Sequence, residues 1–372
     1  MNAVQPIQLL APEGNLVEDE TYSPYIAALS DDDLRSLYRN MALERRLDAE
    51  ATSLQRQGQL ALWVPALGQE GAQVGTIAAL KRSDMVFPTY REHAMALYRG
   101  ITPVELITQF RAVAHAGWTP EKYNFHLYTV VLGAQTLHAA GWAMGIAQDQ
   151  RTGSVPRGRQ EDEIVLACLG DGASSQGDVH ESMVFAGSYG LPMLYFIQNN
   201  HWAISVPSST QSKAPLAARA GGYGFEGVRV DGNDVLGSYA VAAHMAEQIR
   251  AGQGPKLIES VTYRIGAHTT ADDPTKYRSA DEVERWKAQD PVDRYRNWLT
   301  AHETAGESFY DQVDEEAADL AAELRRATLA IQAQPLEEVF DTVYAEPHRQ
   351  VEVEKAWLKD YEAGFAEDGD KA

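Results

Sequence analysis

Two short apolar runs separated by a helical segment constrain the fold of this chain more than any other feature. Residues 164–169 are continuously apolar, which is typical of a parallel strand that is buried on both faces. Residues 170–172, Gly-Asp-Gly, end this run, and residues 178–189 then follow a helical pattern. Residues 193–197 form the next apolar run. This unit of strand, turn, helix and strand predicts two neighbouring parallel strands in an α/β fold.

The same alternation continues along the chain and predicts a mostly parallel sheet flanked by helices. Two further strands are expected at residues 228–230 and 257–265, with a helix over residues 234–250 between them. The helices expected before the sheet cover residues 30–58, 69–81 and 133–147.

The composition divides the chain into three regions. Residues 1–29 contain three prolines and no steady period, so we expect an extended arm. Residues 30–300 hold the alternating strands and helices and are expected to form one α/β domain. Residues 301–372 are helical in pattern and contain 19 acidic and 6 basic residues. We expect this acidic helical region to pack on the same domain.

The charge and the apolar pattern argue against several classes of protein. The chain has 372 residues, and its 32 Lys+Arg against 53 Asp+Glu give a net charge of −21. Nucleic acid is not an expected partner, because neutralising phosphates requires a basic surface. No apolar run is long enough to span a membrane and the first residues lack a secretory signal, so we expect no membrane association and a cytoplasmic location.

Polar residues suited to a hard cation follow the first two predicted strands. Asp171 comes directly after one strand, and Asn199 and Asn200 follow the other. The 26 residues between Gly172 and Asn199 are about what one helix and one strand require, so the two ends are expected to be neighbours. Magnesium prefers oxygen ligands and completes its shell with substrate phosphates. The sequence therefore predicts a magnesium ion and a diphosphate beyond these strand ends.

At this point the residues resemble a known family. Residues 170–205, GDGASSQGDVHESMVFAGSYGLPMLYFIQNNHWAIS, resemble the thiamine diphosphate motif of alpha subunits of the decarboxylating component of 2-oxo acid dehydrogenase complexes. The resemblance implies that Asp171 and Asn200 supply side-chain ligands to Mg²⁺, and that Trp202 supplies its backbone carbonyl. The residues implied to lie against the cofactor around this turn are Gly170, Asp171, Gly172, Ala173 and Asn200.

Two earlier segments extend the resemblance, which covers residues 34–357. Tyr90 and Arg91 lie in FPTYRE, which is similar to the family's FxxYRE segment and would reach the cofactor diphosphate. A guanidinium group suits that role because its planar fork pairs with phosphate oxygens. Leu132, in the segment LGAQ, would touch the aminopyrimidine ring and hold the cofactor in its bent shape.

Residues 263–278, YRIGAHTTADDPTKYR, are similar to the active-site loop of the same family. By this resemblance Arg264 would hold the diphosphate and His268 would be the catalytic residue beside the reactive thiazolium. An imidazole suits that position because it binds a substrate carboxylate when protonated and exchanges protons near neutral pH.

The resemblance implies an oxidative decarboxylation of a 2-oxo acid that depends on thiamine diphosphate and Mg²⁺. The acyl group would pass to the lipoyl group of an acyltransferase core enzyme. The chain corresponds to the diphosphate-binding domain alone, so a beta subunit is expected to complete the site in an α2β2 heterotetramer. Branched-chain 2-oxo acids such as 2-oxoisovalerate are the favoured substrates, and pyruvate is the alternative. A non-catalytic scaffold with the same fold is the alternative of another class.

Overall fold

The computed structural model describes residues 5–113, 117–154, 162–333, 335, 337–341 and 343–366. The ends of the expected arm and of the expected acidic region, residues 1–4 and 367–372, therefore lie outside the described residues. Within the described residues, no helix is both long and apolar enough to cross a membrane.

A parallel sheet with five strands forms the centre of the protein, which confirms the predicted fold class. All of the strand pairs in this sheet are parallel. The predicted strand at 257–265 ends earlier, at Val261, because the following residues leave the sheet to bond with Gly68 and Leu67. In spatial order the strands are β1 (Met85–Phe87), β2 (Val165–Gly170), β3 (Met193–Asn199), β7 (Lys256–Val261) and β6 (Glu226–Asp231).

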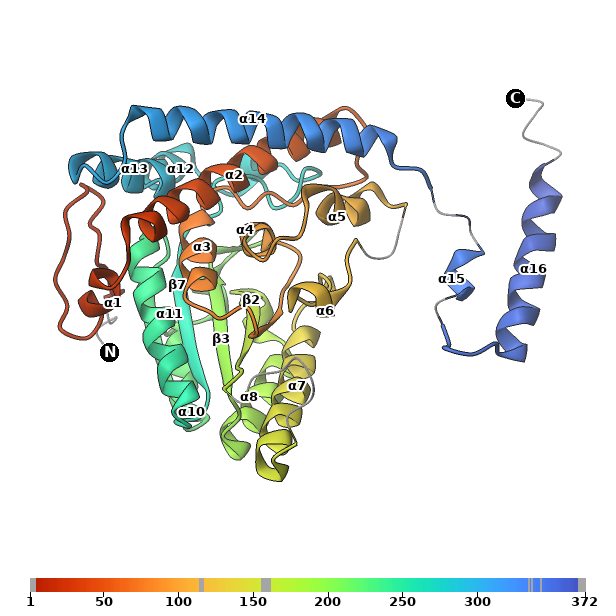
Figure 1. Cartoon of the computed structure of the whole chain (residues 1–372), viewed down its shortest axis with the longest axis horizontal. Helices are drawn as coiled ribbons and strands as arrows, with labels where there is room; N and C mark the ends of the chain where they lie inside the picture. Colours follow the sequence, from red (N-terminus) through yellow and green to blue (C-terminus); the bar gives the residue numbers. More distant parts are fainter. Residues whose placement is uncertain are drawn as a thin grey trace.

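Helices cover both faces of the sheet, which explains why residues 165–169 of β2 and 193–197 of β3 are apolar throughout (Figure 1). Leu166 and Cys168 of β2 pack on the side of α3 (Glu70–Ala78), α4 (His93–Tyr98) and α11 (Val235–Arg250). The alternate residues of β2, including Ala167, pack on the other face of the sheet against two further helices. These helices are α7 (Ala134–Thr152) and α8 (Gly177–Tyr189).

A third layer of helices lies over α3. The long helix α2 (Asp31–Arg56) begins at the predicted cap Ser30, whose hydroxyl accepts the backbone N–H of Asp33 in a capping box. It packs against α13 (Pro291–Ala301) and α14 (Glu307–Ala330). The remaining elements are α5 (Pro103–Thr108), α6 (Pro120–Tyr123), β4 (Trp202–Ala203), β5 (Val206–Pro207), α9 (Ser208–Gln211), α10 (Arg219–Gly222) and α12 (Ala280–Lys287).

The two ends of the chain differ from their expected arrangement. The arm contains a short helix, α1 (Ser23–Ala27), and its first part is extended, with Leu9 and Leu10 buried and their backbone N–H groups donated to Asp234. At the other end, α14 lies on the body, whereas α15 (Glu338–Asp341) and α16 (Arg349–Ala366) stand apart from it (Figure 1). The packing expected for residues 301–372 is thus corrected for α16, and the domain boundaries stay a prediction.

The close contact between α3 and α11 gives a stability prediction. A Cβ atom on Gly75 of α3 would lie 2.5 Å from the carbonyl oxygen of Val235 and 2.6 Å from the Cβ of Ser238. We expect Gly75→Ala to lower the free energy of unfolding by about 2 kcal/mol, because overpacking forces these helices apart. Gly364→Ala in α16, where an added Cβ meets nothing within 4 Å, is the matched control. Denaturant unfolding checks both, and equal stability of the two variants would contradict the close packing.

Candidate functional site

The parallel register places the ends of β2 and β3 side by side at one edge of the sheet. Gly170 at the end of β2 pairs with Gln198 of β3. A cavity of about 220 Å³ opens beyond these ends, where ligands of open α/β sheets bind. Every site residue predicted from the sequence lines this one cavity: Tyr90, Arg91, Leu132, Gly170, Asp171, Gly172, Ala173, Asn200, Trp202, Arg264 and His268.

Oxygen atoms suited to a cation gather on the sheet side of the cavity. The carboxylate of Asp171 is buried, and burial raises its pKa to about 6. The side-chain oxygen of Asn200 accepts the backbone N–H of Trp202 at 3.3 Å, which turns this amide toward the next segment. The carbonyl of Trp202 accepts Arg264 Nη1 at 2.8 Å and retains a second lone pair. A buried carboxylate beside an amide and a carbonyl oxygen fits Mg²⁺, whose charge would offset the cost of burying the acid.

The glycine at position 172 brings these oxygens together. A Cβ atom there would lie 2.7 Å from the Cβ of Ala203, closer than two carbon atoms approach. Gly172 therefore lets the turn after β2 contact the segment after β3. The flanking Gly170 has open space around it, so its backbone is free to face a ligand.

Two buried guanidinium groups also line the cavity, and that of Arg264 contacts the Trp202 carbonyl. Arg91 donates to the carbonyl of Pro65 and, at 2.9 Å, to that of His268. Arg264 donates to the carbonyl of Ile204 at 2.8 Å. Burial lowers the pKa of Arg264 to about 10, which leaves it protonated at neutral pH. Neither group forms a salt bridge within the described part of the chain, so a bound anion would supply the missing negative charge.

The imidazole of His268 lies between these two cations. Its Nδ1 is 3.3 Å from Arg91 Nη2 and 3.2 Å from Arg264 Nη1. Both partners can only donate, so Nδ1 is the acceptor and the proton of the neutral ring is on Nε2. Burial first, and then the two guanidinium charges, lower the pKa of His268 to about 3. The expectation of an imidazole that titrates near neutral pH is therefore corrected for the protein without a bound anion.

Tyr90 and Leu132 complete the wall of the cavity. The ring of Tyr90 meets that of His268 edge-on, with centroids 6.3 Å apart. Leu132 precedes Gly133, which caps α7 with a φ of 96°, a conformation that favours glycine. This turn directs the chain from the cavity wall into the helix, and Leu132 packs against the apolar cluster below.

Several lining residues escaped the sequence analysis because their partners are distant in the sequence. The carboxylate of Glu92 is buried, accepts the backbone N–H and hydroxyl of Thr89 at 2.6 and 2.7 Å, and accepts Gln198 Nε2 at 2.5 Å. This network fixes Tyr90 and Arg91 to the end of β3. The position of Glu92 in the YRE segment, directly after Tyr90 and Arg91, is the sequence signal that could have identified it as a lining residue. The lining residues that were not predicted are Gln69, Thr89, Glu92, Gln198, Ala203, Ile204 and Gln211.

Comparisons with known proteins show what the chain is similar to. The model of the family "Dehydrogenase E1 component" matches residues 38–335. The chain is 45% identical over 344 residues to the 3-methyl-2-oxobutanoate dehydrogenase subunit alpha of Mycobacterium tuberculosis, covering 92% of this chain and 90% of that protein. It is 34% identical over 343 residues to the pyruvate dehydrogenase E1 component subunit alpha of Staphylococcus epidermidis, with 91% and 89% covered. The corresponding protein of Staphylococcus aureus is 35% identical over 324 residues, with 86% and 84% covered.

The unpaired cations give a binding prediction. With Mg²⁺ present, we expect inorganic diphosphate to bind the cavity, and Arg91→Gln or Arg264→Gln to weaken this binding about tenfold or more, because each removes a charge-assisted hydrogen bond. Arg46→Gln, on the exposed side of α2, is the control. The bound anion also offsets the charges around His268, so its pKa rises. Calorimetry and histidine NMR check the two effects, and unchanged affinity in both cavity variants would contradict the assignment.

Proposed function

Because the chain belongs to the dehydrogenase E1 component family, we propose that it is the alpha subunit of a thiamine diphosphate-dependent 2-oxo acid dehydrogenase. The observation that carries this proposal is a cavity that brings oxygen atoms suited to a metal together with two buried guanidinium groups. A diphosphate bridged by Mg²⁺ is the ligand class that such an arrangement fits. A non-catalytic scaffold has no need for buried, unneutralised charges facing one cavity, so we favour an enzyme.

We assign the cofactor contacts as follows. Asp171, Asn200 and the carbonyl of Trp202 would hold Mg²⁺, and Arg91 and Arg264 would hold the diphosphate. The remaining cofactor contacts would come from Tyr90, Leu132, Gly170, Gly172 and Ala173. Thiamine diphosphate supplies, when bound, a nucleophilic carbon and a ring that accepts the electrons released as carbon dioxide leaves. The protein contributes orientation, charge and the exclusion of water.

We propose His268 as the catalytic residue of this chain. Its Nδ1 accepts from the two guanidinium groups, so its Nε2 keeps the one N–H of the neutral ring for the substrate. That N–H can donate to the carboxylate of a 2-oxo acid. Once a diphosphate offsets the nearby positive charges, the pKa of His268 rises, and the ring can then hold a proton for the transfer step.

The site also points to a beta subunit. The carboxylates that line the cavity are Asp171, assigned to the metal, and Glu92, whose oxygens accept from Thr89 and Gln198. Among the described residues, neither of these carboxylates is free for a further role in the cavity, so another chain would complete the site. Val130 and Val131, just before Leu132, are 75% and 73% exposed, as is common at a surface that a partner covers. We propose an α2β2 heterotetramer.

We propose a branched-chain 2-oxo acid such as 2-oxoisovalerate as the substrate. The identity of 45% to the 3-methyl-2-oxobutanoate dehydrogenase subunit exceeds the 34% and 35% to the two pyruvate dehydrogenase subunits. Pyruvate remains the second candidate. The acyl group would pass to the lipoyl group of an acyltransferase core enzyme, and we propose a cytoplasmic location for the assembly.

Turnover by the reconstituted complex tests this proposal. We expect kcat/KM for 2-oxoisovalerate to exceed that for pyruvate about tenfold or more, since each methylene group in an apolar pocket contributes roughly 1–3 kcal/mol. We also expect no turnover by the isolated chain. A preference for pyruvate would overturn the substrate assignment, turnover by the isolated chain would overturn the shared site, and no turnover of either acid by the complex would overturn the activity.

A further inference from the structure

Residues 63–68, which we call the strap, support both Arg91 and the loop that carries His268. Arg91 donates to the carbonyl of Pro65 in the strap. Residues 265–270 of the loop are held by three hydrogen bonds to the strap. The backbone N–H of Ile265 donates to the carbonyl of Leu67, that of Thr270 donates to the carbonyl of Trp63, and Trp63 N donates to the Thr270 hydroxyl, each at 3.0 Å.

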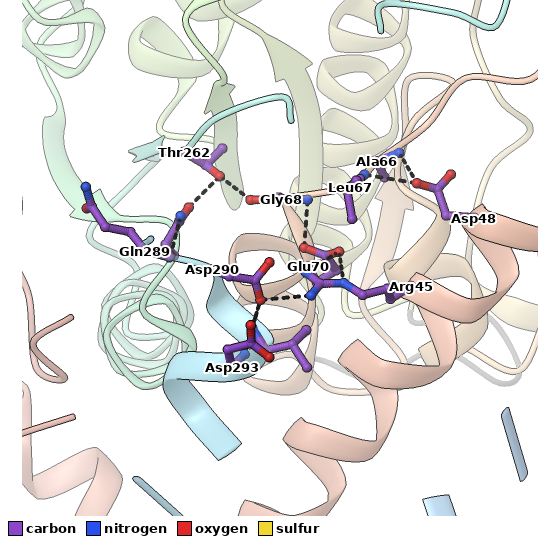
Figure 2. A network of polar contacts seen from close by, with 12 residues as sticks. Arg45, Asp48, Ala66, Leu67, Gly68, Glu70, Thr262, Gln289, Asp290 and Asp293 are labelled. Carbon is purple, nitrogen blue, oxygen red and sulfur yellow. Dashed lines mark hydrogen bonds and ion pairs between the residues drawn. The ribbon is translucent and has the colours of Figure 1, made fainter. Parts of the chain in front are cut away.

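One buried carboxylate of α2 holds the strap. Asp48 accepts Trp63 Nε1 at 2.6 Å through Oδ1, and the backbone N–H groups of Ala66 and Leu67 at 3.1 and 3.0 Å through Oδ2. Figure 2 shows this carboxylate facing the strap at Ala66 and Leu67. A carboxylate only accepts when ionised, so it matches three donors that a neutral amide could not satisfy.

Packing alone does not fix this part of the strap. A cavity of about 460 Å³ lies beside it, lined by Asp48, Pro65, Leu67 and Thr270 among others. The other side of the strap is packed: Trp63 and Val64 are buried in the core, and the carbonyl of Val64 lies 2.9 Å from His93 Nε2. On the side that borders the cavity, hydrogen bonds from Asp48 hold Ala66 and Leu67.

We propose that Asp48 is a positioning residue of the active site, which acts by holding the strap and, through it, Arg91 and the loop of His268. The structural part of this inference concerns this chain alone, and its consequence for catalysis rests on the proposed function. Asp48 itself lies outside the cofactor cavity.

The far end of the strap has a separate anchor, so loss of Asp48 has a local effect. Glu70 accepts the backbone N–H of Gly68 at 2.9 Å, and the carbonyl of Gly68 accepts the Thr262 hydroxyl at 2.7 Å (Figure 2). Arg45 in turn forms ion pairs with Glu70 and with Asp290, each at 2.8 Å. These contacts tie residue 68 to β7 and α13 without Asp48, so we expect the fold to persist when Asp48 is changed.

Glu44, one turn before Asp48 on α2, offers a matched control. Its carboxyl group is buried, and neither of its oxygens has a hydrogen-bond partner within the described residues. Burial, and then the charge of Asp48, raise the pKa of Glu44 well above its usual range. Glu44→Gln and Asp48→Asn each replace a buried carboxyl group by an amide of similar size, but Asp48→Asn places an N–H₂ group against the donors of the strap.

The test compares Asp48→Asn and Glu44→Gln in the complex with the beta subunit, at pH 8. Burial raises the pKa of Asp48 to about 7, against the lowering effect of the Trp63 hydrogen bond, so its carboxylate is mostly ionised there. Glu44, Glu70 and Arg91 are the titratable groups that face it. In Asp48→Asn we expect the rate of amide hydrogen exchange over residues 263–272 to rise about tenfold or more. We expect the Kd for thiamine diphosphate with Mg²⁺ to rise by a similar factor. Glu44→Gln should match the wild type in both.

Wild-type exchange over residues 263–272 in Asp48→Asn would overturn the proposal, as would equal changes in both variants. If Asp48→Asn does not assemble with the beta subunit, Thr270→Val serves as the second variant. It removes the hydroxyl group that accepts the backbone N–H of Trp63, and residue 270 is a partly exposed position of the loop. Faster exchange of the loop in that variant supports the strap contact, and unchanged exchange overturns it. Hydrogen exchange needs no turnover, so a wild-type complex that converts no 2-oxo acid would refute the proposed function without deciding the role of Asp48.

Discussion

The parallel register of β2 and β3 is the constraint on which the site depends. Because parallel strands end at the same edge, a carboxylate after one strand and an amide after the next become neighbours. The buried Asp171 is thereby held where its charge needs a cation, and Gly172 allows the two following segments to meet. The metal side of the cavity follows from the sheet itself rather than from a specialised loop.

The anion-binding part of the cavity depends on charge more than on shape. Arg91 and Arg264 are buried around His268, and together with burial they keep the imidazole neutral. The chain as a whole carries a net charge of −21, of which residues 301–372 contribute 19 acidic against 6 basic residues. Net charge therefore describes the surface of this protein, and a locally positive cavity for an anionic cofactor lies within an acidic molecule.

Local patterns in the sequence predicted strands β2, β3, β6 and β7 and the helices between them, because apolar runs are local. Short motifs and the family resemblance supplied eleven of the residues that line the cavity. What the sequence could not supply were contacts between distant segments. The bond between Glu92 and Gln198 joins residues 106 positions apart, and the strap meets its loop across more than 200 positions. The pKa of His268 depends on Arg91, which lies 177 positions away in the sequence. The helical pattern of residues 349–366 does not indicate what covers α16.

Calorimetric titration of thiamine diphosphate into the complex of this chain with its beta subunit, with and without Mg²⁺, tests the central claim most directly. We expect Asp171→Ala to remove the Mg²⁺-dependent part of the binding. Asp178 is an exposed acid at the start of α8, and we expect Asp178→Ala to leave the binding unchanged. Wild-type affinity and Mg²⁺ dependence in Asp171→Ala would contradict the assignment of the cofactor to the ends of β2 and β3.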